Sequence, residues 1–455
     1  MPKNSLSRRD FIRLGAGAAA VGAAAKVTLL EPRTLWAKPG PVAPSDIVRF
    51  GIIGTGVRGC ELLQASRRVP GVECVAAADL YDSRHIAARE ALGGKDIFTT
   101  REYRQVLDRK DIDAVIVATM DHWHRKIVED AAAAGKDVYC EKPMSHSIED
   151  GKAMVEAIQK NKRMCTVGSQ RVSSILYAKA KEIWDSGKLG EVDTIEAAWD
   201  RNTPSGAWVY PIPPDANEQT IDWNTFLDGK AKRPFDPVLF YRWRCFKDFG
   251  AGLAGDLFVH LLSGIYVVTG TNHPPDRAFS SGGIYYFKDG REFPDLLWTI
   301  YDYPHFQLVL RCNHNNDQEG EFFGFYGKKG TMFIRGNTLT FIPQNKRPQP
   351  EDYSIGGWPK KMRDEYLANW HKEHPQLEPG KYAVDGEQEV YMPPRGYNDT
   401  ADHQANFFQS VRTRKPVVEN EVFGSHTAIG CHMSNYSYFN KKAAVWDPAT
   451  KNIKT

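Results

Sequence analysis

The stretch VRFGIIGTGVRG at residues 48–59 decides the fold of this chain. Its first half is short, apolar and rich in β-branched residues, as a buried parallel strand requires. Its second half is a GxGxxG turn that opens a helix, whose free N–H groups and positive end favour phosphates. In such a turn Gly54 permits the sharp bend, Gly56 lets a pyrophosphate approach, and Gly59 lets helix and strand pack closely. The stretch therefore predicts a dinucleotide-binding turn made of Gly54, Thr55, Gly56, Val57, Arg58 and Gly59, with a purely structural glycine turn as the alternative.

An acidic residue ends the next predicted strand. Residues 72–78 form a second apolar run that stops at Asp79, about 20 residues after the last glycine, where the ribose hydroxyls of NAD bind in this type of fold. An acid at this position repels the 2′-phosphate of NADP, so the sequence favours NAD. Arg84 lies close behind and leaves NADP open as the alternative.

Composition limits the class of protein. With 455 residues, 42% of them hydrophobic, the chain is long enough for a large core and two domains. The net charge of +3 and the lack of a long basic block argue against a nucleic-acid partner. The seven cysteines are scattered and include no CxxC pair, so we expect reduced core thiols and no metal site.

The first 37 residues have the pattern of a twin-arginine export signal. Arg8 and Arg9 precede Phe11 and an apolar Gly/Ala run at residues 14–25. This run is short and weakly hydrophobic for a membrane span, although a retained anchor remains the competing interpretation. Small residues allow cleavage near Ala25 or near Ala37. The pattern predicts a periplasmic or otherwise exported protein that meets the twin-arginine machinery and travels folded.

The remaining chain predicts two domains. Strands and helices alternate over residues 46–168, which is typical of a doubly wound parallel α/β sheet, the Rossmann fold. Residues 169–455 predict an α+β domain with a large, mainly antiparallel open sheet. Residues 343–400 are rich in Pro, Gly and charge and predict a surface excursion. Expected strands of the second domain are 191–198, 282–287, 296–301, 306–311, 321–326 and 330–334, and expected closing helices are 400–411 and 421–442.

The strand at residues 137–140 delivers Glu141, Lys142 and Pro143 to the carboxyl edge of the parallel sheet, where such sheets bind ligands. A lysine beside a nicotinamide ring can donate to a substrate oxygen. The proline restricts Lys142 to extended geometry and favours a fixed loop. The Lys142–Pro143 peptide bond can be cis or trans. The alternative is a surface Glu–Lys pair at a turn.

Asp256 and His260 stand four residues apart in a predicted helix and so share one face. A carboxylate in that position can orient an imidazole that acts as a general base on a hydroxyl. Spacing alone leaves two alternatives open, namely a helix-capping Asp beside an unrelated core His and a two-ligand metal pair.

These three motifs occur in the order found in the glucose–fructose oxidoreductase / inositol dehydrogenase / MocA (Gfo/Idh/MocA) family, which the chain resembles over residues 47–440. The resemblance implies that Lys142, Asp256 and His260 form the catalytic group. It also implies a Rossmann domain followed by an open-sheet domain that mediates homodimers or homotetramers. The family loop Thr-Pro-Asn-x-x-His is matched here by Thr119 and His124 without the proline, so Thr119, His124, Glu141 and Lys142 are expected on the nicotinamide side.

The resemblance implies an exported NAD(P)-dependent oxidoreductase that oxidises or reduces a ring hydroxyl of a sugar or glycoside. Because there is no free NAD pool outside the cytoplasm, the cofactor is expected to stay tightly bound. Paired oxidation and reduction of two sugars, hydrolysis of glycosides by transient oxidation, and a non-enzymatic binding or sensor role are the alternatives. Candidate substrate contacts are Trp123, Gln170, Arg171, Tyr241 and Arg242, together with the adjacent Trp243 and Arg244. For Trp123 the alternative is a packing role. For Arg171 and Arg242 the alternative is a structural ion pair.

Overall fold

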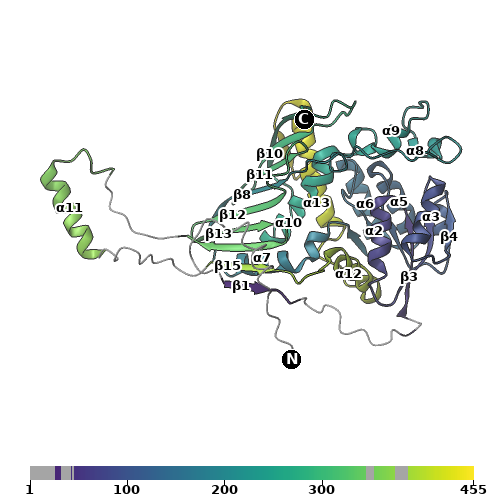
Figure 1. The fold of residues 1–455 in the computed structure, drawn as a ribbon, viewed down its shortest axis with the longest axis horizontal. Coiled ribbons are helices and arrows are strands. Elements are labelled where there is room, and N and C mark those ends of the chain that lie inside the picture. The colour runs from purple at the N-terminus through teal and green to yellow at the C-terminus, as the bar shows by residue number, and fades with distance from the viewer. Residues whose placement is uncertain (1–25, 32–42, 44–45, 345–352, 375–387, 455) are drawn as a thin grey trace.

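The computed structural model describes residues 26–31, 43, 46–344, 353–374 and 388–454. Its elements form two β-sheets, a parallel one and a larger, mainly antiparallel one (Figure 1). This confirms the predicted fold class. Most of the predicted export signal, residues 1–25 and 32–37, lies outside the described residues.

The six-stranded parallel sheet is the predicted Rossmann sheet. Its strand order, β4-β3-β2-β5-β6-β7, reverses direction beside β2, so the carboxyl ends of β2 and β5 flank a crevice at the edge where ligands bind. The strands are β2 (Val48–Ile53), β3 (Val72–Ala78), β4 (Phe98–Thr100), β5 (Ala114–Val117), β6 (Asp137–Cys140) and β7 (Cys165–Val167), and the helices between them are α2 (Val57–Ser66), α3 (Asp82–Ala91), α4 (Arg104–Leu107), α5 (Asp121–Ala133) and α6 (Ile148–Lys160).

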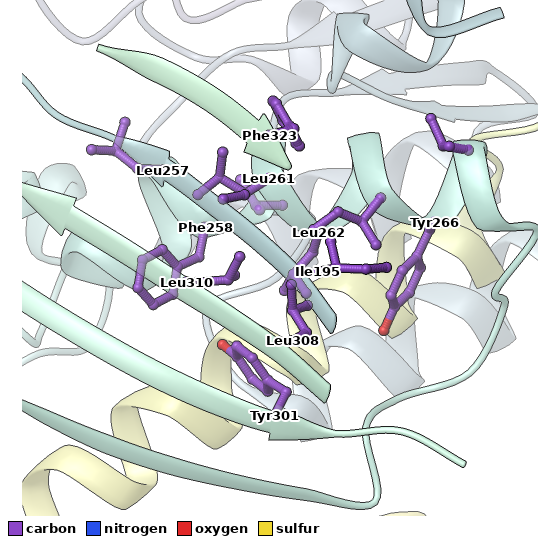
Figure 2. Close-up of a cluster of buried hydrophobic side chains, with 14 of the residues drawn as sticks. Ile195, Leu257, Phe258, Leu261, Leu262, Tyr266, Tyr301, Leu308, Leu310 and Phe323 are labelled. Atoms are coloured by element: carbon purple, nitrogen blue, oxygen red, sulfur yellow. The ribbon is translucent and has the colours of Figure 1, made fainter. Parts of the chain in front are cut away.

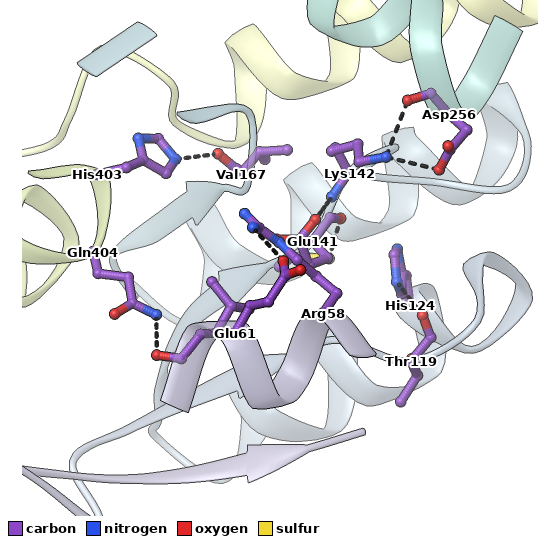
Figure 3. Close-up of polar contacts among 12 residues, drawn as sticks. Arg58, Glu61, Thr119, His124, Glu141, Lys142, Val167, Asp256, His403 and Gln404 are labelled. Carbon is purple, nitrogen blue, oxygen red and sulfur yellow. Dashed lines mark hydrogen bonds and ion pairs between the residues drawn. The ribbon is translucent and has the colours of Figure 1, made fainter. Parts of the chain in front are cut away.

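Helix α12 (Asp399–Thr413) belongs to the C-terminal half of the sequence but packs on the Rossmann domain. Gln404 donates from Nε2 to the carbonyl of Leu62 in α2 at 2.9 Å (Figure 3). Phe407 and Phe408 join Phe50 of β2 in one buried cluster. Helix α12 therefore holds the two domains together, although its position in the sequence assigns it to the second domain.

The second sheet has eleven strands in the order β1-β15-β14-β13-β12-β8-β11-β10-β9-β16-β17. Neighbours are antiparallel except β1 with β15 and β8 with β11. The strands are β1 (Lys26–Leu29), β8 (Val192–Trp199), β9 (Arg277–Gly283), β10 (Leu296–Asp302), β11 (Gln307–Asn313), β12 (Glu321–Gly327), β13 (Gly330–Arg335), β14 (Thr338–Pro343), β15 (Glu389–Met392), β16 (Ala444–Asp447) and β17 (Asn452–Ile453).

Two expected boundaries differ from the structure. The predicted strand at 282–287 is wrong beyond Gly283, because the backbone N–H groups of Tyr285, Tyr286 and Phe287 donate to the Asp295 carboxylate instead of to a neighbouring strand. The leader prediction also placed residues 26–29 outside the fold. They form β1 (Lys26–Leu29), which pairs with β15 at the sheet edge.

The predicted surface excursion contains regular structure. Within residues 353–374 lies α11 (Lys360–Glu373), which has no buried residue and stands apart from both sheets in Figure 1. Strand β15 lies near the end of the same stretch and adds to the larger sheet. Residues 345–352 and 375–387 lie outside the described residues.

A buried apolar cluster fixes the helix that carries Asp256 and His260 (Figure 2). Its helical side comes from the π-helical turn η4 (Ala254–Phe258) and α10 (Val259–Thr269), with α7 (Ile175–Asp185) and α13 (Glu421–Asn440) beside them. Leu257, Phe258, Leu261 and Leu262 face Ile195, Leu308, Leu310 and Phe323 of the sheet. Because close-packed cores resist displacement, this cluster sets where Asp256 lies.

All seven cysteines are free thiols, and all but Cys60 are buried. Among the described residues, no helix combines the length and the apolar character needed to cross a bilayer.

Arg171 connects three elements that follow the Rossmann strands in the sequence. It lies in η2 (Gln170–Ser173) and pairs with Glu321 of β12 at 2.6 Å and with Asp399 of α12 at 2.5 Å. The three side chains are mostly buried, so each charge depends on the others for compensation.

We predict that Arg171→Ala lowers the free energy of unfolding by about 3 kcal/mol, because it leaves two poorly hydrated carboxylates side by side. Urea unfolding measures the loss. The matched control is Arg277→Ala, which breaks an ion pair with Asp302 whose arginine is 60% exposed, and should cost less than about 1 kcal/mol. Equal losses in the two variants would contradict a structural role for Arg171.

Candidate active site at the domain junction

The glycine turn has the backbone geometry that a diphosphate needs. Gly54 adopts a φ of +92°, and a Cβ there would lie 2.5 Å from the carbonyl oxygen of Ala118. A Cβ on Gly59 would lie 2.2 Å from the carbonyl oxygen of Gly54. Helix α2 starts after Gly56 without a side-chain cap, so its first N–H groups remain available to an anion. The turn therefore fits the dinucleotide predicted from the sequence.

A cleft of about 780 Å³ runs along this turn. The Rossmann side contributes Gly54, Thr55, Gly56, Val57, Arg58, Asp79, Thr119, Glu141 and Lys142. Residues that follow the Rossmann strands in the sequence close the other side, among them Tyr210, Tyr241, Trp243, Arg244 and Asp256. The volume lies within the range of cofactor and ligand sites. Both domains thus build one cleft.

Asp79 lies at the tip of β3, as predicted. Its carboxylate accepts hydrogen bonds from the backbone N–H of Thr55 at 2.7 Å and of Tyr81 at 3.1 Å. The guanidinium of Arg84 approaches it to 3.4 Å. Asp79 therefore braces the glycine turn from the end of the cleft where a ribose would lie.

Arg58 turns from the glycine motif toward Glu141. Its Nε donates to Glu141 Oε1 at 2.7 Å (Figure 3). The other oxygen of Glu141 accepts from the backbone N–H of Lys142 at 3.2 Å. A Cβ on Gly168 would lie 2.7 Å from Glu141 Oε1, so the buried carboxylate needs glycine there. This ion pair holds the strand end that presents Lys142.

Lys142 meets Asp256 across the junction of the domains. Its Nζ donates to Asp256 Oδ1 at 2.7 Å and to the Asp256 carbonyl at 3.0 Å (Figure 3). Each side chain is only 11% exposed. The Lys142–Pro143 peptide bond is cis. The two residues predicted from separate motifs therefore lie together in the cleft.

Asp256 has two further partners. Arg244 donates from Nε to Oδ1 at 3.0 Å, and Trp208 donates from Nε1 to Oδ2 at 3.1 Å. Burial by itself raises the pKa of the Asp256 carboxyl, but the charges of Lys142 and Arg244 outweigh it and hold that pKa well below its usual range. Asp256 is thus a fixed anion between two cations.

The predicted contact between Asp256 and His260 is absent from the described hydrogen bonds. Asp256 lies in the π-helical turn η4, and His260 lies just beyond it in α10. The carboxylate points to Lys142, Arg244 and Trp208, so it does not orient the imidazole.

His260 is buried and packs its ring 5.0 Å from that of Trp199. Its Nδ1 has no protein partner in the described part of the chain. Burial, followed by the charges of Lys142 and Arg171, lowers the pKa of His260 well below its usual range. The imidazole is therefore neutral at physiological pH.

His124 does not line the cleft. It is fully buried, with Nδ1 3.0 Å from the carbonyl of Pro143 and Nε2 3.4 Å from the carbonyl of Thr119 (Figure 3). It links two loops of the cleft and contributes to the site through them, whereas the sequence predicted a direct cofactor contact.

The predicted substrate contacts divide into two groups. Trp123 and Tyr241 line the cleft, although Trp123 is buried and donates from Nε1 to the carbonyl of Phe226 at 3.4 Å. Gln170, Arg171 and Arg242 do not line it. Arg171 is the structural ion-pair residue described above, which was one of its two predicted roles.

Two residues around the site had no motif to mark them: Tyr210 lines the cleft, and the buried Trp208 contacts Asp256 without lining it. Trp208 and Tyr210 lie in an irregular loop after β8, and Trp208 has a left-handed φ of 62°, which is rare for an aromatic residue. Arg244 was expected to contact a sugar but pairs with Asp256. The Trp208 and Tyr210 positions depend on tertiary contacts, so neither spacing nor hydropathy predicts them.

Comparison with known proteins agrees with the fold. The chain is 34% identical over 148 residues to inositol 2-dehydrogenase of Salmonella typhimurium (strain LT2), and 37% identical over 145 residues to inositol 2-dehydrogenase 3 of Saccharopolyspora erythraea. The matches cover 32% and 31% of this chain, and the chain spans only 43% and 42% of the length of these relatives.

Two solved structures resemble the whole fold. They are a levoglucosan dehydrogenase in complex with NADH and levoglucosan (TM-score 0.63, 17% identity, covering 88% of this chain and 99% of that one) and an aldose-aldose oxidoreductase from Caulobacter crescentus complexed with glycerol (TM-score 0.63, 15% identity, with the same shares covered). At these identities the likeness shows the fold.

The family model described as "Oxidoreductase family, NAD-binding Rossmann fold" matches residues 48–169, which include the glycine turn, Asp79 and Lys142. Residues 48–169 therefore match the NAD-binding Rossmann domain of the Gfo/Idh/MocA oxidoreductase family.

Proposed function

We propose that the chain is an NAD(P)-dependent oxidoreductase acting on a ring hydroxyl of a sugar, cyclic polyol or glycoside. The observation that carries this proposal is the Lys142–Asp256 pair, 2.7 Å apart, in the same cleft as the glycine turn. The names of its relatives and structural neighbours, inositol and levoglucosan dehydrogenases, support the same substrate class.

In this proposal the bound nicotinamide supplies the hydride acceptor or donor. Asp256 holds the Lys142 ammonium in place, so that its N–H groups can stabilise the oxygen of a hydroxyl as it loses its proton. His260 does not itself line the cleft. It is proposed as the acceptor of that proton because its neutral ring has an Nδ1 with no partner among the described residues. An anionic oxygen beside Lys142 also offsets the charge that lowers the basicity of His260.

We predict that Lys142→Met and His260→Gln each lower kcat by at least about 10²-fold. Both should leave NADH affinity nearly unchanged, because the glycine turn and Asp79 remain intact. Stopped-flow turnover and fluorescence titration with NADH measure the two effects. Lys188→Met is the matched control, since Lys188 pairs with Glu389 away from the cleft and is 44% exposed. Turnover equal to that of the control would contradict the assigned roles.

The substrate is identified in two steps. Mass spectrometry of the nucleotide that co-purifies with the protein tests whether the cofactor is NAD and tightly bound. A panel of pyranoses, cyclic polyols and glycosides is then scored by the absorbance of reduced nicotinamide. Oxidation of at least one of these compounds supports the proposal, whereas a bound cofactor that none of them reduces favours a binding or sensor role.

The same purified protein distinguishes two alternative reactions, glycoside hydrolysis and paired oxidation and reduction of two sugars. Release of nitrophenol from p-nitrophenyl glycosides would indicate hydrolysis by transient oxidation. The lysine of the Glu-Lys-Pro motif, Lys142, argues for a dehydrogenase instead, because the resemblance implies that the hydrolases of the family lack it. Paired oxidation and reduction of two sugars is favoured by the aldose-aldose oxidoreductase among the structural neighbours. Catalytic turnover of the bound cofactor by two sugars without added NAD would identify it.

We also propose that the protein acts outside the cytoplasm after twin-arginine export. Cleavage near Ala25 suits this proposal better than cleavage near Ala37, because it keeps β1 in the larger sheet. Oligomers are proposed to form through the open face of that sheet, where Phe279, Trp298 and Ile300 are exposed.

For export, we predict that replacing Arg8 and Arg9 together by lysine leaves the precursor in the cytoplasm, because the transport machinery reads the arginine pair. Immunoblots of cytoplasmic and periplasmic fractions measure the distribution. Replacing Lys3 by arginine is the control, since it lies outside the pair. Unchanged periplasmic amounts in the double variant would exclude this export route.

A further inference from the structure

The ribose end of the cleft contains charges of both signs. Asp79 is paired with Arg84, whose guanidinium lies 5.2 Å from the ring of Phe240 and 5.6 Å from that of Tyr241. In dinucleotide folds an acid here favours NAD, whereas an arginine nearby accommodates the 2′-phosphate of NADP. Asp79 supplies one carboxylate and Arg84 one guanidinium, so these two residues alone give no clear preference between NAD and NADP.

A segment of the second domain covers this end. Residues 209–222, which we term the strap, cross from the loop after β8 to the tip of β3 and the start of α3. Thr220 accepts from the backbone N–H of Asp82 at 3.1 Å, and the N–H of Asp222 donates to the carbonyl of Leu80 at 2.9 Å. Ile221 forms an isolated bridge with Tyr81. The strap is therefore fixed by backbone hydrogen bonds.

The strap brings a second carboxylate to the same end. Asp215 lines the cleft, and its two oxygens accept hydrogen bonds from the hydroxyls of Tyr81 and Ser83. The backbone N–H of Tyr81 donates to Asp79, so one residue links both carboxylates. The hydrogen bonds from Ser83 and then Tyr81 lower the pKa of Asp215, which keeps it ionised.

We propose that Asp215 is a specificity-determining residue that makes the cleft select NAD over NADP. Arg101 also lines the cleft, but Asp82 neutralises it at 2.6 Å. The remaining two carboxylates, Asp79 and Asp215, against the guanidinium of Arg84 leave a net negative charge where a 2′-phosphate would add nearly two more. Asp215 also accepts the hydrogen bond of the Ser83 hydroxyl, which could otherwise donate to that phosphate. The inference rests on the proposed dinucleotide function and names a residue outside the matched Rossmann segment.

The test is fluorescence titration of the cofactor-free full-length protein with NADH and with NADPH. In Asp215→Asn the side chain keeps its shape and can still accept a hydroxyl hydrogen bond. We expect the ratio of the two Kd values to shift by at least about tenfold toward NADPH, because one repelling charge is removed. The shift should shrink at high salt, as screened charge interactions do.

Glu218→Gln is the matched control, because it removes an exposed carboxylate from the same strap at a position that does not line the cleft. It should leave the ratio unchanged. Equal weakening of NADH and NADPH in Asp215→Asn would overturn the inference, since the residue would then only hold the strap, and so would an unchanged ratio. If the parent protein binds neither nucleotide, the proposed function itself fails.

Discussion

The ion pair between Lys142 and Asp256 is the contact on which the rest of the site depends. It joins the carboxyl edge of a parallel sheet to a π-helical turn of the second domain. Two mostly buried charges are tolerable only when each is compensated. Arg58 and Glu141 brace the lysine side, while Arg244 and Trp208 brace the aspartate side. The domains therefore create the reactive position only when they are docked.

Much of the Rossmann half could be predicted because its signals are local. Glycine spacing, short apolar strands and an acid after β3 act within a few residues of one another, and β2, β3 and β6 lie where the pattern placed them, whereas the short β4 was not predicted. The motif order also predicted the meeting of Lys142 and Asp256. The expected orientation of the His260 imidazole by Asp256 does not appear among the described contacts, because the Asp256 carboxylate is bonded to Lys142, Arg244 and Trp208 instead.

Longer-range features escaped prediction for a different reason. Asp215 reaches the cleft, and Trp208 reaches Asp256, through the irregular segment after β8, which has no periodic pattern. His124 and Arg171 were expected to meet ligands, but each is satisfied by protein partners that come from other elements: Pro143 and Thr119 for the histidine, and Glu321 and Asp399 for the arginine. Helix α12 and strand β1 likewise find their places only through tertiary contacts.

The central claim is that Lys142 and Asp256 act as one unit, and a double-mutant cycle on turnover tests it most directly. Lys142→Met, Asp256→Asn and the double variant are compared under conditions where all three bind NADH. The account predicts strong non-additivity: the double variant loses about as much kcat as the worse single variant. Losses that multiply independently would contradict it, because the two side chains would then contribute separately.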